Sequence, residues 1–179
     1  MSLSEMAASR ALDFKRHLAD LRAGCYEGAA ERDEKELTFR SAVDLLTPVA
    51  EWVLQTFNDK MLAGTGTVAD SGIRRAANAM LERMWTLSWP GQVTAVRRAG
   101  PPGPVLPITI RAHFPPGWTH GHLAGAAIGH WPLQVLTAED AARQAPILWA
   151  IAEAEFHERI YETVTPWEGV PAPIGTGRP

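Results

Sequence analysis

The apolar residues at the start of the chain recur with the period of an α-helix. In the segment 4–24 they are spaced alternately four and three apart, at Ala7, Ala11, Phe14, Leu18 and Leu21. This spacing places them on one stripe of a helix, and Gly24 is a suitable residue to end it. We expect an amphipathic helix whose apolar stripe packs against the rest of the domain.

Two further segments carry a helical period. The segment 33–57 opens with Asp33 and Glu36 at the spacing of a capping box. Pro48 lies inside its apolar stripe, which predicts a kink or break near residues 44–47. The segment 64–87 follows a turn rich in glycine and threonine, and its stripe is Ile73, Ala77, Met80, Met84 and Leu87. We expect these three helices to pack as a bundle.

The middle of the chain has a different character. Prolines are frequent between Trp89 and Trp118, which excludes long helices there. Two short runs, 92–98 and 105–113, have the composition of strands, and Pro107 places the second at a sheet edge or at the start of a strand. We interpret residues 113–122 as a loop and residues 130–136 as a third strand.

The last segment predicts a helix with a clear start. Thr137 is followed three residues later by Asp140, which is the spacing of an N-terminal cap. Pro146 should separate a first turn, 138–145, from the main helix. One apolar row at spacing four then runs through Leu148, Ala152, Phe156, Ile160 and Val164. Residues 165–179 are rich in proline and glycine, and we expect an extended tail.

Together these segments predict an α+β fold that is rich in helix. We expect a bundle of about four helices packed with a small antiparallel sheet of two to three strands. Residues 1–164 should form a single globular domain, and residues 165–179 the extended tail.

Composition narrows the class of protein. The chain has 179 residues, a net charge of −3 and one cysteine, Cys25. It has too little positive charge to hold a nucleic acid backbone, and no apolar run long enough to cross a bilayer. A lone cysteine forms neither an intramolecular disulfide nor a thiolate metal cage. We expect a cytoplasmic protein without nucleic acid or membrane partners.

Histidines are concentrated in one stretch of the sequence. Of six histidines, four lie between residues 113 and 130, namely His113, His120, His122 and His130. Imidazole is a common ligand of divalent transition metals, and a residue spacing of two puts His120 and His122 on one side of an extended chain. These four residues are therefore candidate metal ligands, although their spacing matches no established ligand motif.

The last predicted helix carries a second candidate group. Its polar row contains Glu153 and His157, which are four residues apart and could act as a carboxylate–imidazole pair in catalysis. Trp149 and Tyr161 extend the same row and could line a ligand pocket. Two more tryptophans, Trp118 and Trp131, lie in the histidine-rich stretch and are further candidates for that pocket. The alternative is an ordinary helix with a solvated polar row.

Two classes of function follow from these patterns. The first is a small accessory or structural protein that acts through a homo-oligomer or a protein partner, as seven tryptophans and wide apolar stripes suggest. The second is a small-molecule-binding protein or metal-dependent enzyme, with its site between the 113–130 segment and the last helix. The sequence leaves open whether the protein is an enzyme, and it favours the first class.

Overall fold

The structure, a computed structural model, describes residues 3–90, 106–125 and 129–162. Its helices are α1 (Leu3–Ala23), α2 (Arg32–Met61), α4 (Ala138–Arg143) and α5 (Ala145–Glu162). Its strands are β1 (Thr67–Asp70), β2 (Arg74–Arg75), β3 (Leu81–Ser88), β4 (Ile108–Phe114), β5 (His122–Ala124) and β6 (His130–Pro132). The predicted strand at 92–98 and the predicted tail at 165–179 lie outside the described residues.

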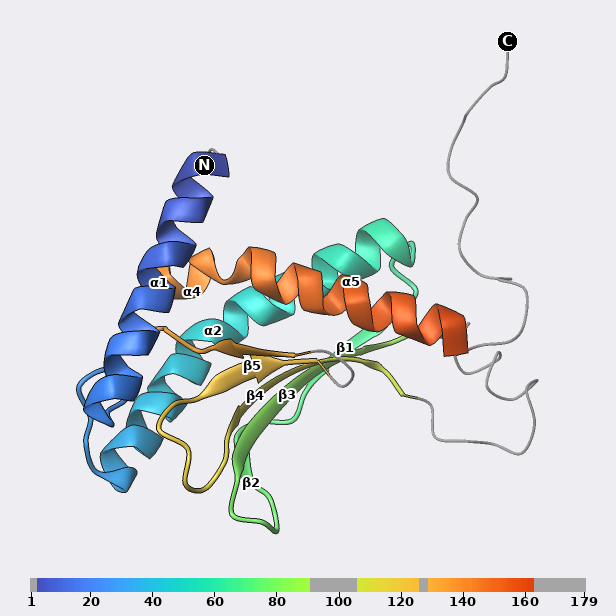
Figure 1. Cartoon of the computed structure of the whole chain (residues 1–179). Coiled ribbons are helices and arrows are strands. Elements are labelled where there is room, and N and C mark those ends of the chain that lie inside the picture. The colour runs from blue at the N-terminus through green and yellow to red at the C-terminus, as the bar shows by residue number, and fades with distance from the viewer. Residues whose placement is uncertain (1–2, 91–105, 126–128, 163–179) are drawn as a thin grey trace.

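The strands form one antiparallel sheet in the order β1-β3-β4-β5-β6, with β2 paired to β3 beside β1. Figure 1 shows α2 and α5 on one face of this sheet, and α1 across one of its ends. The helix-facing side chains of β3 and β4 are almost all apolar and buried: Leu81, Trp85, Leu87, Ile108, Ile110, Ala112 and Phe114. They form a single core with the apolar stripes of α2 and α5.

The predicted third helix is wrong. Residues 67–88 form β1, β2 and β3 instead, and residues 76–80 make the turn that reverses the chain. Ala79 adopts a positive φ of 63° in that turn. In β3 the alternate residues Leu81, Trp85 and Leu87 are buried, so the burial follows a period of two rather than the helical period.

This error also changes the predicted architecture. The described residues form three long helices, the short α4 and a six-stranded sheet, rather than a bundle of about four helices with a sheet of two or three strands. The fold is α+β, but the sheet, not a helix bundle, forms the centre of the domain. The predicted run 105–113 is confirmed over residues 108–113, which belong to β4, while the run 130–136 is a strand only over β6.

The helix boundaries were predicted more closely. Pro48 lies inside α2, yet the helix continues from Arg32 to Met61 without a break. Its cap is formed by Glu31 and Glu34 rather than by Asp33 and Glu36. The predicted cap of α4 is confirmed, because the side chain of Thr137 accepts a hydrogen bond from the main chain of Asp140. Among the described helices, none is long and apolar enough to cross a membrane.

Candidate functional site

The histidines gather at the end of the sheet where α1 crosses it. Five imidazole rings form a chain of neighbours, here called the histidine cluster. They belong to His17 of α1, His113 of β4, His120 of the loop between β4 and β5, His122 of β5 and His130 of β6. The ring centroids of His17 and His120 are 4.6 Å apart, and those of His113 and His130 are 5.0 Å apart. The cluster therefore joins α1 to three strands.

Strand register explains why three of these rings meet. His113 is paired with His122 across β4 and β5, and Ala124 of β5 is paired with His130 of β6. Directly paired residues project from the same face of a sheet, so these imidazoles share the face that α2 and α5 leave uncovered. The indole of Trp118, from the loop between β4 and β5, lies 4.9 Å from the ring of His122.

The cluster runs from the interior to the surface. His120 is completely buried and His113 is 2% exposed, whereas His130 is exposed and Trp118 is 41% exposed. Burial lowers the pKa of His113 and His120 to about 4, and that of His122 to about 3. Neighbouring imidazoles lower the pKa of His122 further, because each disfavours a charge on the next. These three imidazoles are therefore neutral at pH 7.

Three imidazole nitrogens in the cluster are buried and have no hydrogen-bond partner among the described residues. They are the Nδ1 atoms of His17, His113 and His122. The predicted metal site gains no support, since among the described residues no group of three or more histidine, cysteine, aspartate or glutamate side chains is placed to hold a metal ion. The four predicted ligands are neighbours, but their nitrogens do not converge on one point.

The buried end of the cluster is a polar network centred on Asp20 of α1. Its Oδ2 atom accepts hydrogen bonds from the main-chain nitrogen of Glu27 at 3.0 Å and from the Gln134 amide at 3.3 Å. The Nε2 atom of His120 lies 3.4 Å from the same oxygen. Cys25 donates its thiol to Oδ1 of Asp20 at 3.3 Å. One carboxylate of α1 thus connects α1 to the following loop and to the segment after β6.

Charged side chains extend this network along α1. Arg16 donates to Glu27 at 2.7 Å and lies 3.7 Å from Asp140 of α4. Arg143 of α4 pairs with Asp140. Burial raises the pKa of Asp13 and of Glu27, even though Arg16 stabilises both carboxylates. The face of α1 that meets the domain is therefore polar and titratable.

The opposite face of α1 is apolar and exposed. The exposed fractions of Phe14, Leu18 and Leu21, which belong to the predicted stripe, are 55%, 36% and 47%. The predicted helix is confirmed, but the predicted packing of its stripe is wrong. No other described helix or strand packs closely along α1. The helix is held by its polar side, and its apolar stripe, here called the outer face of α1, is left uncovered.

The candidate residues of α5 lie elsewhere. Glu153 and His157 are exposed on α5, whereas His120 is fully buried against α1, so the structure does not bring the two groups together. Trp149 is half-buried and packs on Phe57 of α2, with ring centroids 5.3 Å apart. Their roles in a reaction or in ligand binding stay a prediction.

The remaining two aromatic candidates fall on different elements. Trp131 of β6 is partly buried and packs against the core, and Tyr161 lies in the last turn of α5. Trp118 is the aromatic candidate that joins the histidine cluster.

Sequence reasoning missed three members of the site, His17, Asp20 and Gln134. His17 and Asp20 are three residues apart and therefore share one face of α1, opposite the apolar stripe. That pairing could have marked a polar contact face. Gln134 has no distinguishing pattern, and its position is known only once β5 and β6 are paired.

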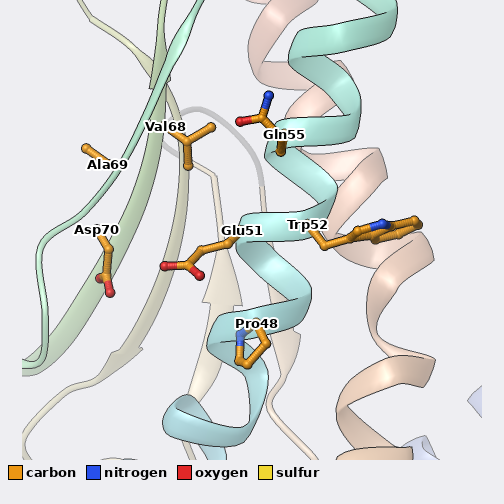
Figure 2. A pocket seen from close by; sticks show the side chains of 7 residues that line it. All are labelled: Pro48, Glu51, Trp52, Gln55, Val68, Ala69 and Asp70. Carbon is orange, nitrogen blue, oxygen red and sulfur yellow. The ribbon is translucent and has the colours of Figure 1, made fainter.

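A separate cavity of about 520 Å³ lies between α2 and the edge strand β1. Figure 2 shows Glu51 pointing across it toward Asp70, and Trp52 directed away from β1. Asp70 is already paired with Arg83, at 2.5 Å. The lining residues offer two carboxylates without the converging donors and acceptors typical of a small-molecule site.

Comparison with protein-family models, with curated proteins and with solved structures finds no match for this chain. The function is therefore inferred from the geometry of α1 and of the histidine cluster.

Proposed function

We propose that this protein is a small accessory protein that works as a self-assembled pair, joined through the outer face of α1. The supporting observation is the reversed orientation of α1, whose apolar stripe is exposed while its polar side contacts the domain. A contiguous exposed apolar patch on a folded protein commonly marks an interaction site.

The spacing of the stripe suits a second copy of the same helix. Apolar residues that alternate at four and three repeat every seven positions, which is the pattern of two helices packed side by side. A two-fold axis would place the same face on both copies. Covering half-exposed leucine or phenylalanine side chains yields roughly 1 kcal/mol for each one.

The charges beside the stripe give the pair a distinctive salt dependence. The exposed charged residues in the described side chains of α1 are the cations Lys15 and Arg22, because Asp13 and Asp20 face inward. Two copies would therefore bring like charges together, and added salt should screen that repulsion and strengthen assembly. An acidic partner helix would show the opposite salt dependence.

Sedimentation velocity over a range of micromolar concentrations tests the proposal. The wild-type protein should form a dimer that strengthens with salt. Leu18→Glu should weaken it by about 30-fold, because a loss of roughly 1 kcal/mol counts once in each copy. The matched control is Leu37→Glu, since Leu37 is 64% exposed on α2 and should not matter. A wild-type monomer at every concentration, or equal effects of the two variants, would overturn the proposal.

A further inference from the structure

His120 has one hydrogen-bond arrangement that suits its neutral form. Its Nδ1 atom lies 2.8 Å from the carbonyl oxygen of Gly121, so Nδ1 carries the proton and donates. Its Nε2 atom then has a free lone pair, which accepts from the side-chain amide of Gln134 at 2.6 Å. The same amide nitrogen lies 3.3 Å from Asp20. In this arrangement Gln134 connects the imidazole to α1.

The opposite orientation of the Gln134 amide also joins His120 to α1. The amide oxygen then accepts from Nε2 of His120 at 2.6 Å and from the main-chain nitrogen of His17 at 3.3 Å, and the amide nitrogen donates to Glu27. Gln134 therefore bridges His120 and α1 in either orientation.

We propose that His120, Gln134 and His17 form a proton-sensitive latch that holds α1 against the domain at neutral pH and releases it on mild acidification. The release itself follows from the burial of the adjacent His17 and His120 rings where α1 meets the domain. Its consequence for assembly rests on the function proposed above, because the outer face belongs to the helix that the latch holds.

The sign of the effect follows from which state binds more protons. His17 and His120 are buried where α1 meets the domain, and burial lowers the pKa of both. When α1 leaves, both rings reach water and recover an ordinary pKa near 6.5. The released state therefore binds more protons below about pH 6.5, and acid favours release.

The other groups that face His120 set the limits of this response. Asp20 of α1 favours a charge on His120, whereas His17 of α1 disfavours it. Tyr26 stacks on the ring with centroids 4.0 Å apart, and its pKa is raised by burial, so it stays neutral. Glu27 has a pKa raised by burial, and protonating it relieves a buried charge. Glu27 therefore opposes release, but only at a pH closer to its own pKa.

On the strand side, His122 faces His120 with ring centroids 6.0 Å apart. It is more strongly held in the neutral form, with a pKa lowered to about 3. A proton on His122 would repel one on His120, so His122 adds to the preference of the closed state for neutral rings. Protonation of the cluster thus favours the released state on both sides of His120.

Release would weaken the docking surface. Most of the stability of a helix in a protein comes from tertiary packing, so a released α1 would lose the fixed stripe that a second copy recognises. Acidification should therefore weaken assembly, and assembly should in turn oppose the release of α1.

Hydrogen exchange of the α1 amides at pH 7 and pH 5, corrected for intrinsic rates, tests the latch. A ring whose pKa moves from 6.5 to about 4 should raise the opening equilibrium of α1 by about 20-fold across this interval. The amides of β3 report global unfolding and should remain better protected than those of α1. Unchanged protection of α1, or loss only in step with β3, would overturn the proposal.

Two variants each remove one of the imidazoles that take up a proton. His120→Gln removes the central ring, and His17→Leu replaces a ring whose Nδ1 atom is buried without a partner. Each should reduce the pH response of α1, whereas His157→Gln, an exposed position on α5, should leave it unchanged. If His120→Gln fails to fold, the pH response of α1 in His17→Leu still tests the latch. A full response in His17→Leu would contradict the latch.

The failure of the latch can be separated from the failure of self-assembly. Leu18→Glu should weaken the dimer by about 30-fold but keep the pH response of α1, since the substitution lies on the outer face. A wild-type monomer that still releases α1 in acid would contradict the proposed self-assembly but not the latch. A stable dimer in which the opening of α1 does not depend on pH would contradict the latch but not self-assembly.

Discussion

The buried histidines predict that the free energy of unfolding falls sharply in mild acid. His113 and His120 are both almost completely buried, and burial lowers the pKa of each from 6.5 to about 4. A histidine whose pKa is lower in the folded state contributes its full stability above pH 6.5. That contribution is lost as the pH falls toward 4, because the unfolded chain takes up the proton first.

The size of the loss follows from the two pKa values. Between pH 7 and pH 5, a group with a pKa of 6.5 unfolded and about 4 folded loses about 2 kcal/mol. Two such groups lose about 4 kcal/mol, which is a large part of the 5–15 kcal/mol that stabilises an ordinary domain. Carboxylates with lowered pKa values, such as Asp70 and Glu36, lose their contributions only at lower pH.

Urea unfolding followed by tryptophan fluorescence at pH 7 and pH 5 measures this loss. His113→Phe keeps a ring of similar size and removes the titration, so the pH-dependent loss should fall by about 2 kcal/mol. The variant should also be stable at pH 7, because it removes a buried nitrogen without a partner. His157→Gln serves as the exposed control. Equal free energies of unfolding at the two pH values, or an unchanged loss in His113→Phe, would contradict this prediction.

Two further substitutions test the packing around the site. Gly121→Ala would place a Cβ atom 2.6 Å from the ring of Phe39 and should cost about 1–3 kcal/mol in thermal or urea unfolding. Gly129→Ala, whose added Cβ atom would meet no atom of the described residues within 4 Å, should cost little. Asn58→Ala would leave the main-chain nitrogen and oxygen of Gly66 without their side-chain partners and should cost about 1–3 kcal/mol by the same measurement. Equal stability of the two glycine variants, or an unaffected Asn58→Ala, would contradict these accounts.

The misassigned segment 64–87 shows why a short apolar pattern does not decide between helix and strand. Its apolar residues fit a helical period by chance, while the true alternation in β3 is hidden by Arg83. That arginine sits between Leu81 and Trp85 because it pairs with Asp70 of β1 and Asp44 of α2. The partners that make a charged residue acceptable at such a position are distant in sequence.

The sequence predicts the helix α1 but not which of its sides faces the domain. Its helical period was predicted correctly, since period is a local property. Which side faces the domain depends on Glu27, Gln134 and Asp140, which the fold brings to α1 from later in the chain. The grouping of His120 and His122 was visible in the sequence, but their neighbour His17 was not, because it lies on the face assumed to be solvated.

The reversed orientation of α1 links assembly to protonation through thermodynamic reciprocity. If acid release weakens the pair, then pairing must by the same factor resist acid release. Raising the protein concentration populates the pair and should shift the opening of α1 to lower pH. Leu18→Glu should remove this concentration dependence while leaving the opening itself, because the substitution touches the outer face and not the latch. Opening of α1 at the same pH in dilute and concentrated wild-type protein would mean that the two faces of the helix act independently.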